Sequence, residues 1–160
     1  MSVTYSILFS LAVCVSAAGL EALFAGKNMK PFLAKLRAPA YSPSLFVWGL
    51  IGVGYYAICF TILYRIFRGE SDSSAGRVAL ILLSIVMALN AFWNYTFFRL
   101  ENLRLSFILS LAYGAIALAL FSYLIWFDRI SALVLVPYVL YMTYSYRWGH
   151  QLLKLNPELK

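Results

Sequence analysis

The feature that most constrains this chain is a series of apolar runs, each about 20 residues long. A helix rises 1.5 Å per residue, so about 20 residues cross roughly 30 Å of hydrocarbon. Only helices and closed barrels satisfy their backbone polar groups in lipid, and barrel strands alternate apolar and polar residues over about 10 positions. The runs do not alternate, which predicts an all-α, polytopic membrane protein built as a five-transmembrane-helix bundle. The predicted spans are 4–25, 45–67, 78–98, 105–127 and 130–148.

Composition agrees with this fold class. Hydrophobic residues make up 63% of the 160 positions and charged residues 12%, about half the usual share of about 25% in a soluble domain. The connections are short apart from a long first loop at 26–44. No segment is long enough for a second domain, so we expect a single membrane domain over residues 1–160.

The basic residues divide unevenly between the two sides that five spans define. Nine lie on the side of the first loop, the third loop and the C-terminus: Lys27, Lys30, Lys35, Arg37, Arg99, Arg104, Arg147, Lys154 and Lys160. Four lie on the other side: Arg65, Arg68, Arg77 and Arg129. By the positive-inside rule the nine face the cytoplasm and the N-terminus lies outside. The net charge of +7 therefore indicates topology and contact with anionic lipid head groups, not nucleic acid.

Ionisable groups are nearly absent from the predicted spans, which disfavours a proton pump or an ion channel. Apart from Arg65 and Arg147, which lie close to span ends, the exception is Glu21, one turn before the end of the first span. We interpret it first as a side chain that extends to the interface near Lys27, and second as a ligand-contacting carboxylate. Asp128, beside Arg129, is most simply a solvated turn. No nucleophile–base pair, paired carboxylates or metal-ligand cluster occurs, so no catalytic residue, metal site or resident cofactor is predicted.

Two predicted spans carry polar and aromatic stripes. In the third, Asn90, Trp93, Asn94 and Phe97 follow at i, i+3, i+4 and i+7, and therefore share one helical face. Such carboxamides either bond to neighbouring helices or form the wall of a pocket.

The fifth span contains Pro137 and, after it, a second stripe. This stripe begins at Tyr141 and continues with Ser145 at i+4 and Trp148 at i+7. These residues suit a cleft for a flat apolar ligand, or an aromatic belt at the membrane interface.

The first loop contains stiff and apolar residues where a solvated linker would be rich in Gly and Ser. We expect it to fold over the end of the bundle as a lid, the alternative being an interfacial segment without a gating role. The residues on which this prediction depends are Phe32, Leu36, Pro39, Tyr41 and Pro43.

Together these segments resemble a known family. The third span reads Ala88-Leu89-Asn90, Trp93-Asn94 and Phe97-Phe98, and the fifth reads Val136-Pro137-Tyr138 and is followed by Leu155-Asn156. With Pro39-x-Tyr41-x-Pro43 before the second span and Tyr56 within it, the whole chain is similar to the TspO/MBR family, which includes the translocator protein or peripheral-type benzodiazepine receptor.

The resemblance implies five helices with the N-terminus outside and the C-terminus in the cytosol, and homodimers in many members. It implies a receptor or transport-type protein whose ligands are tetrapyrroles such as porphyrin or heme, sterols such as cholesterol, or similar flat apolar molecules. The one enzymatic alternative is light-dependent porphyrin breakdown, and a third hypothesis is a ligand-responsive sensor or scaffold that regulates a partner. With no organelle extension, a bacterial inner membrane is favoured over a mitochondrial outer membrane.

Carried over by position, the resemblance implies pocket roles for Asn90, Trp93, Ser145 and Gly19, and makes Tyr56 a candidate. Tyr141 and Tyr41 stand where the family usually has Trp, Phe32 replaces a loop Trp, and Gly52 replaces a Trp of the second span. Trp48, four residues before Gly52, shares its helical face and refills part of that wall. His150 stands at the tyrosine of the family's cholesterol-recognition pattern, which weakens the case for cholesterol.

Overall fold

The computed structural model describes residues 2–27, 29–69 and 73–159. These residues form six α-helices and one π-helical turn, without a strand. In chain order the elements are α1 (Val3–Ala25), α2 (Met29–Lys35), α3 (Leu45–Arg68), α4 (Ser74–Asn94), the π-helical turn η1 (Tyr95–Arg99), α5 (Leu103–Phe127) and α6 (Arg129–Leu155). Lys160, one of the nine cations of the charge count, lies outside the described residues.

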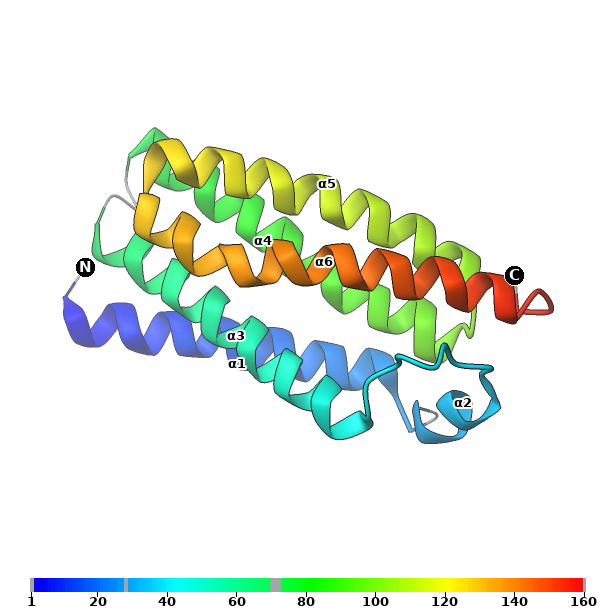
Figure 1. The fold of residues 1–160 in the computed structure, drawn as a ribbon. Helices are drawn as coiled ribbons and strands as arrows, with labels where there is room; N and C mark the ends of the chain where they lie inside the picture. Colours follow the sequence, from blue (N-terminus) through cyan, green and yellow to red (C-terminus); the bar gives the residue numbers. More distant parts are fainter. Residues whose placement is uncertain (1, 28, 70–72, 160) are drawn as a thin grey trace.

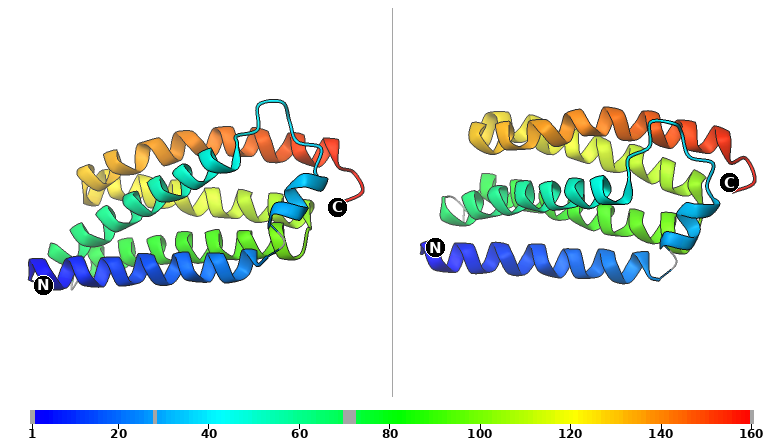
Figure 2. Two further views of the ribbon diagram at one scale, coloured as in Figure 1. Left: turned by 90° about the horizontal axis from the view of Figure 1, so that it is seen from below. Right: turned by 60° about the horizontal axis from the view of Figure 1, so that its bottom comes forward.

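Five long helices run side by side along one axis, and α2 lies at the end of the bundle where the chain finishes (Figures 1 and 2). α5 packs mainly on α4 and α6, and α1 packs on α3 and α4. The first loop, the link between η1 and α5, and the C-terminal segment share that end, which is the grouping used in the charge count (Figure 1).

Polar side chains fix where the five long helices begin. The first backbone N–H groups of a helix lack partners within it, and in each case the residue before the helix accepts a hydrogen bond from one of them. The capping residues are Ser2, Ser44, Ser73, Asn102 and Asp128. The observed starts lie close to the predicted ones, whereas α6 continues to Leu155 beyond the predicted end at Trp148.

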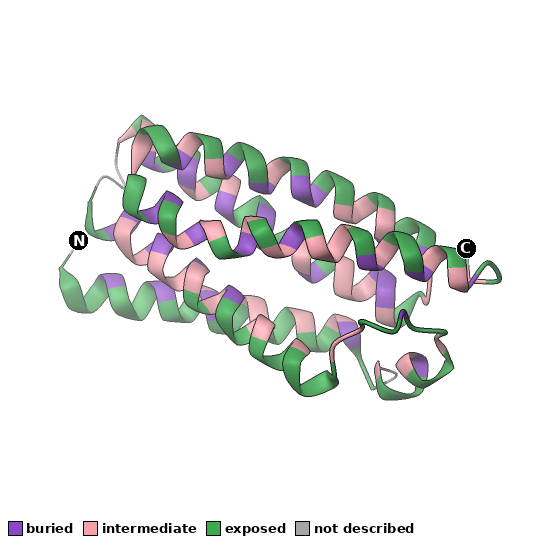
Figure 3. Ribbon diagram, in the orientation of Figure 1, coloured by how far each residue is buried: buried purple, intermediate pink, exposed green. Residues whose placement is uncertain are grey.

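Exposed residues lie along the outside of the long helices (Figure 3), and many of them are large and apolar. Phe46 and Trp126, for example, are 74% and 78% exposed. By length and hydropathy, four helices of the described chain can cross a membrane: α1, α3, α4 with η1, and α5. This supports an integral membrane protein in contact with lipid. The fifth crossing, within α6, stays a prediction because α6 does not meet the same standard of apolarity.

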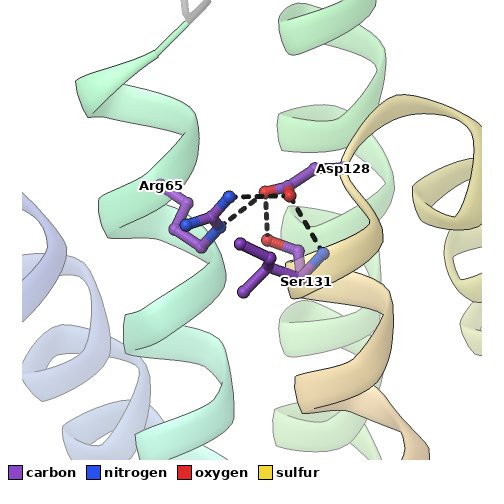
Figure 4. Close-up of polar contacts among 4 residues, drawn as sticks. Arg65, Asp128 and Ser131 are labelled. Atoms are coloured by element: carbon purple, nitrogen blue, oxygen red, sulfur yellow. Dashed lines mark hydrogen bonds and ion pairs between the residues drawn. The ribbon is translucent and has the colours of Figure 1, made fainter.

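An ion pair joins α3 to the turn between α5 and α6 (Figure 4). Arg65 donates from Nε to Oδ2 of Asp128 at 2.7 Å and from Nη2 to Oδ1 at 2.8 Å. Ser131 Oγ also donates to Oδ2 at 2.7 Å. The interpretation of Asp128 as a simple solvated turn is therefore wrong. The Arg65 guanidinium, helped by Ser131, lowers the pKa of the Asp128 carboxyl from 3.8 to about 2.

Asp128→Asn tests this ion pair, because asparagine keeps the helix cap and removes the charge. We expect the variant to lose about 1 kcal/mol of unfolding free energy at neutral pH, since the pair is bidentate but partly exposed. A lowered carboxyl pKa stabilises the fold above the ordinary value, so the wild-type advantage should disappear as pH falls from about 4 to below 2. Thermal unfolding in detergent across this range measures it.

The matched control for this experiment is Glu158→Gln, which removes an exposed carboxylate near the C-terminus. It should leave both the unfolding temperature and its pH profile unchanged. Equal profiles for wild type and Asp128→Asn would contradict the stabilising role of the ion pair.

Candidate ligand-binding site

A cavity of about 350 Å³ lies between α1, α3, α4 with η1, α5 and α6, and Met29 and Leu33 of α2 also border it. Six of the eight ligand-binding residues predicted from the sequence line it: Trp48, Asn90, Trp93, Tyr141, Ser145 and Trp148. The structure thus brings the stripes of α4 and α6 together around one space. A ligand-binding role for these residues stays a prediction.

The other two predicted residues, Gly19 and Tyr56, are not among those that line the cavity. Gly19 is exposed on α1. Tyr56 lies behind the wall, where its hydroxyl donates to Glu21 at 2.6 Å. Tyr56 therefore positions a lining residue and does not itself border the space.

The π-helical turn η1 widens the aromatic wall that α4 begins. Leu100 N donates to the carbonyl of Tyr95, five residues earlier, at 3.0 Å. In such a turn, two residues five positions apart lie on the same side of the helix. Turns of this kind often occur at functional sites. Trp93 stacks on Phe97 with ring centroids 4.7 Å apart and meets Phe98 edge-on at 6.2 Å. Both phenylalanines consequently line the cavity.

A second aromatic group comes from α3 and α6. Trp48 meets Trp148 edge-on at 5.3 Å and Tyr141 at 6.4 Å between ring centroids. Gly52 lines the cavity too, and no atom outside its own stretch of helix lies within 4 Å of where its Cβ would stand. Trp48 thus supplies aromatic surface on this face of α3, and the space beside Gly52 stays part of the cavity.

Glu21 is the acidic residue in the lining, and its side chain is half-buried. Its Oε1 accepts hydrogen bonds from the Tyr56 hydroxyl at 2.6 Å and from Asn90 Nδ2 at 2.5 Å. The carboxylate therefore points into the bundle, and our first interpretation, that it extends to the interface near Lys27, is wrong. The sequence showed one carboxylate within a span but gave no signal for its partners 35 and 69 residues away.

The first loop is fastened to α6 and to the C-terminal segment. Trp148 Nε1 donates to Ser42 Oγ at 2.8 Å, and Tyr144 donates to the carbonyl of Tyr41 at 3.1 Å. Asn156 accepts from the backbone N–H of Arg37 at 2.9 Å and donates to its carbonyl at 3.1 Å. These bonds hold the loop against the end of the bundle.

We predicted that five residues of the first loop form a lid, and none of them lines the cavity. Phe32 is fully buried and packs on Phe97 at 5.4 Å between ring centroids, with Leu36 in the same cluster. Pro39, Tyr41 and Pro43 do not line the cavity. The segment borders it instead through its neighbours Met29, Leu33 and Leu45, which the sequence analysis did not single out.

The chemistry of the lining suits binding. It combines aromatic rings with one carboxylate, two carboxamides and a few hydroxyl groups, as in a site for an apolar ligand oriented by a few polar contacts. Across the described ranges, no group of three His, Cys, Asp or Glu side chains could hold a metal ion.

Apolar helices around an aromatic cavity define a helical integral membrane protein with an internal cavity suited to small molecules. The sequence profile of the TspO/MBR family matches residues 9–147, and the chain belongs to this family. A search of curated proteins finds no match.

The adjacent residues Tyr55 and Tyr56 allow a test of the hydrogen bond that holds Glu21 beside the cavity. The Tyr56 hydroxyl bonds to Glu21, whereas the Tyr55 hydroxyl is buried without a hydrogen-bond partner in the described part of the chain. We expect Tyr56→Phe to lower the unfolding free energy by about 1–3 kcal/mol, because a half-buried carboxylate loses a donor. Tyr55→Phe should be neutral or stabilising, because it removes an unpaired polar group. Denaturant unfolding of both variants in one detergent measures the difference, and equal losses would contradict this arrangement.

Proposed function

We propose that this protein binds tetrapyrroles such as porphyrin or heme, or similar flat apolar ligands such as sterols, in the cavity beneath the first loop. The observation that carries this proposal is the double aromatic lining. Trp93, Phe97 and Phe98 come from α4 and η1, and Trp48, Tyr141 and Trp148 come from α3 and α6. Membership of the TspO/MBR family supports a membrane ligand-binding or transport-type role.

The physical basis is the stacking of a planar ligand on the aromatic rings of the lining. Aromatic pairs contribute about 0.5–1.5 kcal/mol each beyond the burial of their area, and a planar macrocycle offers a face to several rings at once. The basic residues at this end of the bundle, including Lys30 and Arg147, are exposed. They suit the acidic side chains of a tetrapyrrole, which would remain near the surface while its ring system is buried.

The proposed arrangement in the membrane has five crossings, with α6 as the fifth. Its polar C-terminal part would extend past the hydrocarbon into the head-group region, which explains its lower apolarity. The cation-rich end, with the first loop and the C-terminus, would face the cytosol. The N-terminus would lie outside.

We propose a homodimer as the assembled form. Ser84, Ala88, Ala115 and Ala119 form two small-xxx-small patterns, and all four residues are exposed in the single chain. Small residues at this spacing let helices of neighbouring copies approach closely.

Titration with protoporphyrin IX, followed by tryptophan quenching in detergent, tests the binding site. Replacement of both Trp93 and Tyr141 by alanine should weaken binding about tenfold or more, because two rings of the lining are lost. The matched control replaces Tyr5 and Trp126, which are 67% and 78% exposed on the outer surface. That control should bind as wild type does. Equal affinity of all three proteins would show that the porphyrin binds elsewhere.

A further inference from the structure

Glu21 presents hydrogen-bonding capacity that the protein itself leaves unused. Both of its hydrogen bonds, from Tyr56 and Asn90, reach Oε1. Within the described ranges Oε2 accepts none, and a carboxylate has about four acceptor positions. The Tyr55 hydroxyl is the one buried side-chain oxygen or nitrogen without a partner in that part of the chain. Oε2 is not among such buried atoms, so it is accessible, and Glu21 lines the cavity.

Among the residues that the structure describes, Glu21 has no cationic partner either. The ion pairs between described residues join Lys35 to Glu101 and Arg65 to Asp128. A carboxylate in an apolar cavity is costly to hold without an opposite charge. The two hydrogen bonds fix the position of the carboxylate and supply no opposite charge, which a cationic group of a ligand would provide.

We infer that Glu21 recognises a basic nitrogen on the ligand, and that the cavity prefers a flat aromatic molecule with one protonated amine or amidine over a neutral molecule of the same shape. This inference rests on the proposed function, because it takes the cavity as the ligand site. The protonated nitrogen donates to Oε2 while the ring system lies among the aromatic side chains. Asn90 and Tyr56 act as positioning residues that hold the carboxylate.

The surrounding rings favour the same chemistry. Trp93 lines the cavity with Glu21, and an indole face attracts cations that have left water. The charge of the whole protein disfavours cationic ligands, because a net charge of +7 repels cations from the outer surface. A preference for cationic ligands must therefore arise at a specific acidic group, and Glu21 is the acidic residue of the lining.

Three probes of one shape test the inference on the unmodified protein: 9-aminoacridine, which is cationic at neutral pH, neutral acridine, and anionic acridine-9-carboxylate. Fluorescence titration in detergent should give an affinity for 9-aminoacridine about tenfold or more above that for acridine, the usual size of a charge-assisted hydrogen bond. The carboxylate should bind most weakly. This comparison needs no variant, so it stands even where a substitution disturbs folding.

Glu21→Gln assigns the preference to this side chain. Glutamine has the same size and keeps an oxygen for Tyr56 and Asn90, so the wall should remain in place. We expect 9-aminoacridine to bind about tenfold more weakly than to wild type while acridine stays within about twofold. Glu158→Gln is the matched control, since it removes an equal charge outside the cavity, and it should keep the full preference.

The outcomes separate this inference from the proposed function. Equal binding of the three probes to wild type, or a preference that survives Glu21→Gln, overturns the role of Glu21 while protoporphyrin IX binding still supports the cavity. Failure of protoporphyrin IX and all three acridines to bind removes the cavity as a ligand site, and the inference with it.

Discussion

The hydrogen bonds of Glu21 hold together the wall on which the proposed site depends. Tyr56 on α3 and Asn90 on α4 both donate to one oxygen of a carboxylate on α1. The three groups are half-buried and bond to one another, so they link the three helices at this level. The same bonds set the direction of the carboxylate and place a charge on the cavity wall.

The two ends of the bundle use their polar groups differently. At one end, Arg65 and Asp128 satisfy each other and fasten α3 to the α5–α6 turn (Figure 4). At the other end, the first loop is held by Trp148 and Asn156, and no cation among the described residues pairs with Glu21.

Much of the fold could be predicted from the sequence, because length and apolar periodicity are local properties. Four predicted spans correspond to helices long and apolar enough to cross a membrane, and polar caps such as Ser44 lie where the runs begin. The fifth span was harder because α6 mixes apolar with polar residues. The stripe from Asn90 to Phe97 was visible for the same reason, since residues at helical spacing share a face whatever they contact.

The remainder of the site depends on contacts between distant segments, which periodicity does not show. Nothing local pairs Glu21 with Tyr56, or Arg65 with Asp128. The π-helical turn that adds Phe98 to the wall is a change of register that helical spacing alone does not predict. The apolar content of the first loop was evident from the sequence. The packing of α2 on the end of the bundle decides which of its residues face the cavity, and the sequence does not show that packing.

A structure determined with bound protoporphyrin IX is the sharpest test of whether the cavity between the helices is the ligand site. We expect the macrocycle to lie beneath the first loop, in contact with Trp93 and Tyr141 and within reach of Glu21. A macrocycle bound on the outer, lipid-facing surface of the helices, with the cavity empty, would contradict it.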